Sequence, residues 1–241
     1  MAGPPTPRGD EKPQWRSVAE EQTDGIIYAP QGLEDGISAL AAEPVFAEIL
    51  AKAGSPRFRR RRNGFGTLLH IILEQQVSID AAAAMYRRLL GLCRPLVPRA
   101  FLMLDDATLR SCGFSRQKMG YARDFAAMVE SGKFDFAALA TADDDTALAQ
   151  LLTIRGIGRW SAEIYLLFAL GRADIWPAAD LGLQDSVSKH LHLEIRAGEM
   201  ELRRRGEAWR PWRSVAACLF WQSYLHERGR AAPRLPPELY A

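Results

Sequence analysis

The stretch that most constrains the fold is residues 151–170, which read LLTIRGIGRWSAEIYLLFAL. Apolar residues recur at helical spacing on both sides of the short segment RGIG, which cannot comfortably continue a helix. Gly156 and Gly158 permit a positive φ and a close approach of another part of the chain. The pattern therefore predicts two helices joined by a tight hairpin. Free N–H groups at the start of the second helix favour a phosphate, although glycines that serve only the turn are the alternative.

Helical spacing also dominates the rest of the chain, and no segment shows the sustained alternation that is typical of a sheet. We therefore expect an all-α fold over residues 33–230, with a largely disordered or extended tail at 1–32 and a second tail at 231–241. The expected helices are residues 33–53, 64–76, 79–92, two short pieces between 98 and 111, 115–131, 141–154, 159–170, 182–193 and 212–227.

The composition excludes several classes of protein. A chain of 241 residues forms one large domain or two closely packed lobes. Cys93, Cys112 and Cys218 are too few and too widely spaced for a disulfide framework, a four-cysteine zinc site or an iron–sulfur cluster. No apolar run has the length of a membrane span, so we expect no membrane partner. The net charge of +2 does not by itself indicate a nucleic-acid partner.

Asp180 lies 24 residues after Gly156, in the segment DIWPAADLGL at 174–183. Three other segments stand out: QQVS at 75–78, GFSRQK at 113–118 and WRPWRSVAACLFWQSY at 209–224. With the hairpin, these motifs resemble the 3-methyladenine DNA glycosylase II family, which is part of the helix-hairpin-helix (HhH-GPD) DNA glycosylase superfamily. The resemblance covers residues 35–228. The chain departs from it in Ala179, where many members carry a second acid, and in lacking room for the sheet-rich N-terminal domain of larger bacterial members.

The resemblance implies a two-lobed fold with the active-site cleft between the lobes. It also implies an enzyme that flips an alkylated purine of the 3-methyladenine type out of duplex DNA and hydrolyses its N-glycosidic bond, leaving an abasic site. Asp180 is then the catalytic carboxylate, which stabilises positive charge on the sugar and orients the attacking water. The same residue would suit the N-cap of the following helix, so both roles are open. Asp174 and Asp185 are interpreted as structural.

Trp160, Ile164 and Trp221 correspond to the pocket that receives the extruded base. Aromatic faces attract a cationic base, although a tryptophan on a helix is more often a core residue. Ile164 stands where some relatives carry tyrosine. Trp160 also stands where relatives with strand-nicking lyase activity carry a lysine that forms a Schiff base, so the resemblance implies a monofunctional enzyme.

The resemblance also places the contacts with DNA. A side chain of the 75–78 corner, Gln76 first, would fill the gap left by the extruded base; the alternative is that Gln75 and Gln76 only cap the end of a buried helix. The hairpin would bind a backbone phosphate. The residues expected to contact DNA are Gln76, Val77, Ser78, Gly156, Gly158 and Arg159. Arg57 and the four arginines at 59–62 are either a further DNA contact or solvated surface.

We expect no cofactor other than a Na⁺ or K⁺ ion at the hairpin when DNA is bound. By resemblance its ligands are the backbone carbonyls of Leu152, Ile154 and Gly156. The three aspartates at 143–145 look like a metal cluster but are better explained as acids at the start of a helix.

Two alternatives to alkylpurine excision stay open. One is a glycosylase for another lesion, such as hypoxanthine, uracil or ethenoadenine, and the other is a non-catalytic helix-hairpin-helix DNA-binding protein. In either enzyme interpretation the partner is damaged double-stranded DNA, and we expect a monomer in the cytoplasm, associated with the nucleoid.

Overall fold

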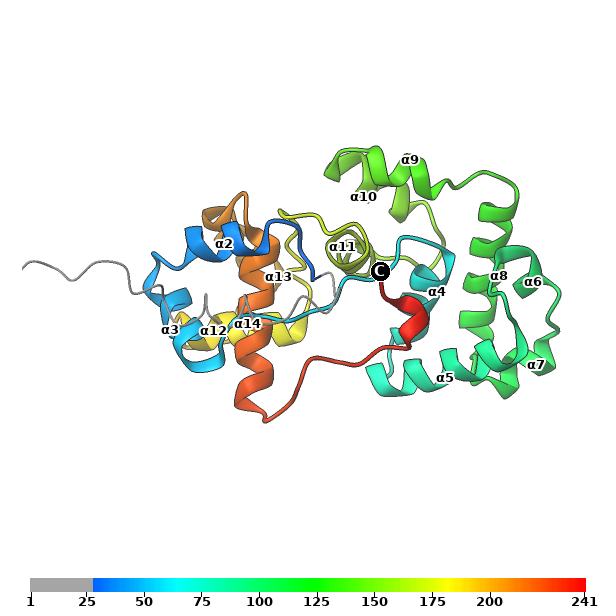
Figure 1. Ribbon diagram of the computed structural model, residues 1–241, viewed down its shortest axis with the longest axis horizontal. Coiled ribbons are helices and arrows are strands. Elements are labelled where there is room, and N and C mark those ends of the chain that lie inside the picture. Colours follow the sequence, from blue (N-terminus) through cyan, green and yellow to red (C-terminus); the bar gives the residue numbers. More distant parts are fainter. Residues whose placement is uncertain (1–27) are drawn as a thin grey trace, which may run out of the picture.

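The computed structural model describes residues 28–241, and this part of the chain is helical, without a β-sheet (Figure 1). The all-α expectation is confirmed. Of the tail expected at residues 1–32, residues 1–27 lie outside the described residues, whereas residues 28–32 are bound to the helical body: Ala29 is buried and donates to Phe58 O, and Gln31 donates to Gly171 O, both at 2.8 Å. Within residues 28–241, no helix combines the length and the hydropathy that a membrane span requires. The elements are α2 (Leu33–Leu40), α3 (Pro44–Ala53), α4 (Phe65–Glu74), α5 (Ile79–Leu92), α6 (Pro98–Leu102), α7 (Asp106–Ser111), α8 (Arg116–Glu130), α9 (Phe136–Thr141), α10 (Asp144–Leu152), α11 (Arg159–Phe168), α12 (Leu181–His190), α13 (Glu199–Gly206), η1 (Glu207–Trp209), α14 (Arg213–Glu227) and η2 (Pro237–Leu239).

The helices form two lobes (Figure 1). In one lobe α14 packs against α2, α3 and α12, so this lobe combines helices from both ends of the described chain. In the other, α4 packs against α5 and α8, and α6 packs against α8. Between the lobes lies α11, which contacts α4 and α10. The two-lobed architecture expected from the sequence is therefore present.

Several helix boundaries differ from those expected. The helix expected at 33–53 is two helices, because Pro44 has no N–H and starts α3 at its first turn. Thr141 does not open a helix: it ends α9, and the side chain of Asp143 caps α10 by accepting from Thr146 N–H at 2.9 Å. Neither α9 nor α13 was expected from the sequence.

The segment 57–62 crosses from one lobe to the other and is hydrogen-bonded along its length. Its backbone pairs with Tyr28, with the end of α11 and with the C-terminal residues. Arg60 donates to Leu170 O at 2.7 Å, and Arg62 donates to Tyr240 O at 2.5 Å. Arg60 and Arg62 are therefore structural links, the first to the residues that follow α11 and the second to the end of the chain.

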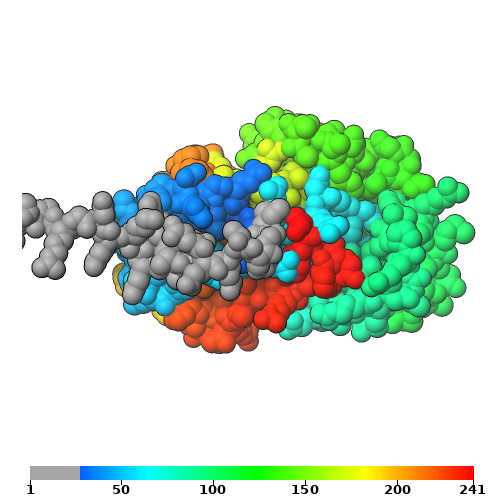
Figure 2. All heavy atoms as spheres, in the orientation of Figure 1, coloured from blue at the N-terminus to red at the C-terminus, as the bar shows by residue number. Residues whose placement is uncertain are grey.

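The C-terminal residues are not the free tail that the sequence predicts. Leu235, Leu239 and Tyr240 are buried, and the Tyr240 ring lies 4.0 Å from the Arg59 guanidinium carbon. Figure 2 shows this segment, in red, packed against the helical body. Burial of these three apolar side chains keeps the end of the chain in place.

A buried charge cluster ties the crossing segment to α4. The guanidinium of Arg61 donates to both carboxylate oxygens of Glu74, at 3.3 and 3.4 Å, and His70 Nδ1 lies 3.2 Å from Glu74 Oε1. Burial alone raises the pKa of the Glu74 carboxyl, but Arg61 and His70 outweigh it and lower this pKa to about 2. The cluster therefore stabilises the fold while Glu74 is ionised.

The cluster predicts how stability depends on pH. The pKa of Glu74 is lower in the folded chain than its ordinary value, so its contribution is complete above about pH 4.5 and is lost as the pH falls toward 2. Glu74→Gln should lower the free energy of unfolding at pH 7 by about 3–5 kcal/mol, because it leaves the Arg61 charge buried and unpaired. The variant should also lose less stability than wild type between pH 4.5 and 2.

Urea unfolding at a series of pH values measures both effects. Glu48→Gln, which removes an exposed ion pair with Lys52, is the matched control and should leave both quantities unchanged. If Glu74→Gln and wild type lose the same stability between pH 4.5 and 2, this loss does not come from protonation of Glu74.

The two hairpin glycines differ in what they require. Gly156 has φ of 89°, and a Cβ there would lie 2.3 Å from the ring of Tyr121, whereas a Cβ on Gly158 would meet nothing within 4 Å. Gly156→Ala should therefore destabilise the fold by roughly 2 kcal/mol or more, and Gly158→Ala by less than about 1 kcal/mol. Thermal unfolding of the two variants side by side measures the difference. If Gly156→Ala destabilises the fold as little as Gly158→Ala, the turn does not need a glycine at position 156.

Candidate active site

The Asp180 carboxylate lies where the two lobes meet and accepts hydrogen bonds from three helices. Oδ1 accepts from the Trp221 indole N–H at 2.9 Å and from Leu183 N–H at 2.8 Å. Oδ2 accepts from the Trp160 indole N–H at 3.1 Å. Asp180 is thus both the N-cap of α12 and the group on which Trp160 of α11 and Trp221 of α14 converge. Of the two roles that the sequence left open, the structure confirms the N-cap.

This geometry leaves the carboxylate able to act. A carboxylate has about four lone-pair positions, and these three donors occupy three of them, so one on Oδ2 stays available. Asp180 is half-buried, so a substrate or a water molecule can reach it. The start of α12 adds the positive end of a helix dipole beside the negative charge. The arrangement can stabilise a cation or orient a water molecule.

The three residues expected to line the base pocket are not alike. Trp160 is half-buried, whereas Ile164 is buried and Trp221 is 9% exposed. The Trp221 ring stacks on Phe168, with centroids 5.8 Å apart, and packs edge-on against Phe58. In this structure Trp221 therefore orients Asp180 through its N–H and packs its ring in the core, and Trp160 is the aromatic face that a ligand can contact.

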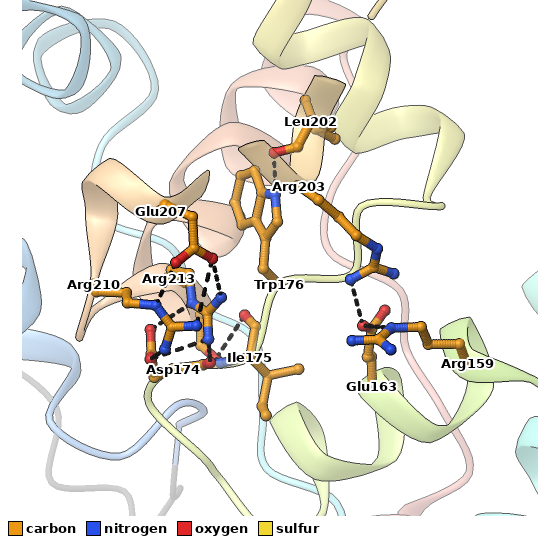
Figure 3. Close-up of polar contacts among 11 residues, drawn as sticks. Arg159, Glu163, Asp174, Ile175, Trp176, Leu202, Arg203, Glu207, Arg210 and Arg213 are labelled. Atoms are coloured by element: carbon orange, nitrogen blue, oxygen red, sulfur yellow. Dashed lines mark hydrogen bonds and ion pairs between the residues drawn. The ribbon is translucent and has the colours of Figure 1, made fainter. Parts of the chain in front are cut away.

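The loop before Asp180 is anchored at three consecutive residues (Figure 3). Arg210 and Arg213 bind the Asp174 carboxylate at 2.6 and 2.7 Å, which confirms Asp174 as structural. Ser214 Oγ accepts from Ile175 N–H at 2.9 Å, and the Trp176 indole donates to a backbone carbonyl of α13 at 2.8 Å. The motif at 209–224 therefore holds the loop that carries Asp180.

The hairpin exposes its turn and the start of α11. Gly158 and Arg159 are exposed, and Gly158 is the N-cap of α11 without a side-chain cap. The first N–H groups of α11 have no partner within that helix, so they can bind an anion. The hairpin glycines and Arg159 thus lie on one exposed edge.

The 75–78 corner reaches the hairpin through a residue that the sequence did not single out. Gln75 Nε2 donates to Gly156 O at 2.7 Å and to Ser161 Oγ at 3.3 Å. Gln76 is exposed and has φ of 58°, a left-handed conformation that a non-glycine residue adopts only under local constraint. Gln75 therefore holds corner and hairpin together, and Gln76 presents its side chain outward.

Two motif residues explain how the corner keeps its shape. Ser78 caps α5 as expected, accepting from Ala81 N–H at 3.2 Å. The Lys118 Nζ donates to Leu73 O at 2.7 Å, and burial lowers the pKa of this ammonium. The lysine of the 113–118 motif thus binds the carboxyl end of α4. Val77 is exposed beside them.

Glu163 is a second functional candidate that sequence reasoning missed. It is buried on α11 and accepts from Arg159 Nε at 2.9 Å and from Arg203 at 3.0 Å (Figure 3). The available signal was a single acid inside the apolar run WSAEIYLLF. By contrast, the aspartates at 143–145 start α10, and within residues 28–241 no group of three or more His, Cys, Asp or Glu is placed to hold a metal.

Comparison with known proteins agrees with this geometry. Residues 69–211, more than half of the chain, match the family described as HhH-GPD superfamily base excision DNA repair protein. A putative DNA-3-methyladenine glycosylase of Bacillus subtilis is 28% identical over 168 residues, which cover 66% of this chain and 58% of that protein. The chain thus spans little more than half the length of this relative.

Solved structures give the same result. The Schizosaccharomyces pombe 3-methyladenine DNA glycosylase in complex with abasic DNA superposes with a TM-score of 0.72 at 25% identity, covering 80% of this chain and 96% of that one. A DNA-3-methyladenine glycosidase from Bacillus halodurans superposes with a TM-score of 0.68 at 32% identity, covering 82% and 91%. The chain therefore belongs to the HhH-GPD superfamily of base excision DNA repair proteins.

Proposed function

We propose that this protein is a DNA glycosylase that hydrolyses the N-glycosidic bond of alkylated purines, such as 3-methyladenine, and leaves an abasic site. The observation that carries the proposal is the Asp180 carboxylate, fixed by Trp160 and Trp221 where the two lobes meet. A protein that only binds phosphate through a hairpin needs none of these three side chains. The relatives named above support the substrate class.

The proposed chemistry follows from the charge that develops in the reaction. As the base leaves, positive charge accumulates on the deoxyribose, and a fixed carboxylate stabilises it without having to reorient. The lone pair left on Asp180 Oδ2 orients the water that attacks the sugar. An alkylated purine already carries positive charge, so it departs without a general acid, and the Trp160 face attracts that cation.

We further propose that water is the nucleophile and that the enzyme is monofunctional. Trp160 occupies the hairpin position at which lyases carry their lysine, and residues 151–170 contain no lysine. Lys118, the lysine of the 113–118 motif, donates to a backbone carbonyl of α4. No amine is therefore placed in the hairpin to form a Schiff base.

DNA binding is proposed to use the hairpin edge and the corner. The free N–H groups at the start of α11 and Arg159 would bind a phosphate, and Gln76 would enter the space left by the base. The protein would act as a monomer on damaged duplex DNA.

The hairpin carbonyls are compatible with the monovalent cation expected from the sequence. Leu152 is exposed at the end of α10. The Ile154 carbonyl accepts from Ile157 N–H at 3.0 Å and the Gly156 carbonyl accepts from Gln75 Nε2 at 2.7 Å, and each keeps a second lone pair. We propose Leu152, Ile154 and Gly156 as ligands, and the ion would add positive charge between the hairpin and a phosphate.

Replacing the catalytic carboxylate tests the proposal directly. Asp180→Asn should reduce single-turnover excision of 3-methyladenine or 7-methylguanine by about 100-fold or more, because the transition state loses its opposite charge. The fold should survive, since asparagine also caps helices. Asp185→Asn, five residues along the same helix and paired with Arg196, is the control and should excise normally. Near-normal excision by Asp180→Asn would contradict the assignment of Asp180 as the catalytic carboxylate.

The absence of lyase chemistry is tested separately. With wild-type enzyme, borohydride should trap no covalent adduct with DNA, and the strand should stay intact until alkali is added. Denaturing gels with and without alkali show the outcome, and a known glycosylase/lyase serves as the positive control. Efficient trapping would mean that an amine of this chain reaches the sugar.

A further inference from the structure

Glu163 and its two arginines form a network on the hairpin side of α11 (Figure 3). One carboxylate oxygen, Oε1, accepts from Arg159 Nε at 2.9 Å and from Arg203 Nη1 at 3.0 Å. The other oxygen is buried and has no hydrogen-bond partner among the described residues. The Glu163 side chain is 4% exposed and the Arg159 side chain 52%. The buried Glu163 carboxylate thus holds the exposed Arg159 guanidinium in place.

Stability alone does not explain this arrangement. Desolvating a carboxylate is costly, an unpartnered buried oxygen adds to that cost, and an apolar residue would suit this helix better. Arg203 does not depend on Glu163, because Glu199 also binds it through two nitrogens, at 2.8 and 3.1 Å. What Glu163 adds is the fixed position of Arg159.

Arg159, whose position Glu163 fixes, lies where it can bind a phosphate. It follows Gly158 directly and stands in the first turn of α11, beside the N–H groups proposed to bind phosphate. Glu163 uses only its Nε, so both Nη groups stay available for a fork-shaped contact with phosphate oxygens. Fixing the long side chain beforehand removes the loss of its conformational freedom on binding.

We propose that Glu163 is a positioning residue for DNA binding: from inside α11 it fixes the Arg159 guanidinium beside the hairpin to receive a backbone phosphate. This inference rests on the proposed function for its ligand, DNA, and not on which lesion is excised. It assigns to a buried acid a role in binding a polyanion.

The sign of the effect separates the proposal from simple electrostatics. Removing a negative charge near DNA should by itself tighten binding. If Glu163 positions Arg159, Glu163→Leu should instead weaken binding to undamaged and abasic duplex by about three- to tenfold and lower the salt slope by about one. Arg159→Ala should give a similar loss, and the double variant should bind no worse than Arg159→Ala.

The experiment is a fluorescence titration of labelled duplex at several salt concentrations, with thermal unfolding to check each fold. Glu199→Leu is the matched control: it removes the same charge from the same network without touching Arg159, so it should not weaken binding. Glu163→Gln keeps an acceptor oxygen and should bind DNA at least as well as wild type.

Three outcomes overturn the proposal. The first is that Glu163→Leu binds DNA as tightly as wild type or more tightly. The second is that Glu163→Leu weakens binding by the same factor in the Arg159→Ala background as in wild type. The third is that Arg159→Ala keeps the affinity and the salt slope of wild type. The last holds even if Glu163→Leu does not fold. If the variants bind DNA as expected here but the wild-type protein excises no base, the proposed function is wrong and this inference still holds.

Discussion

The hydrogen bonds of Trp160, Trp221 and Leu183 to one carboxylate are the interaction on which the rest of the structure depends. The Leu183 bond is local to α12 and the Trp221 bond comes from α14 of the same lobe, whereas the Trp160 bond ties this carboxylate to α11, which lies between the lobes. The carboxylate in turn satisfies two indole N–H groups that would otherwise be costly to bury. The proposed chemistry and the packing therefore share the same atoms at Asp180.

A second constraint is that the chain crosses between the lobes through a segment rich in arginine. Arg61 is buried between Glu74 and the ring of Phe168, and Arg60 donates to the Leu170 carbonyl just after α11. Guanidinium groups suit this use because their several donors satisfy backbone carbonyls and carboxylates together. The charges of Arg60 and Arg61 thus serve internal bonding, whereas Arg155 and Arg159 are exposed basic groups of the hairpin.

Local signals predicted much of the fold correctly. Ser78 and Ser115 begin helices because a short polar side chain can accept from a backbone N–H three residues ahead, which needs no distant partner. The expectation at Thr141 was wrong by two residues, since Asp143 competes for the same end. The helix α13 has few apolar residues and is stabilised by ion pairs within itself, so hydrophobic spacing gave no sign of it.

The sequence by itself determined the all-α class, the hairpin glycines and the candidacy of Asp180, because these follow from spacing, backbone freedom and motifs read along the chain. Only the tertiary structure decided what each side chain does at the junction. It buried the ring of Trp221 and left Trp160 accessible, joined Gln75 to the hairpin across 81 positions, and placed Glu163 under Arg159. Hydrogen bonds between residues far apart in sequence depend on how helices pack, and that packing is a property of the whole chain.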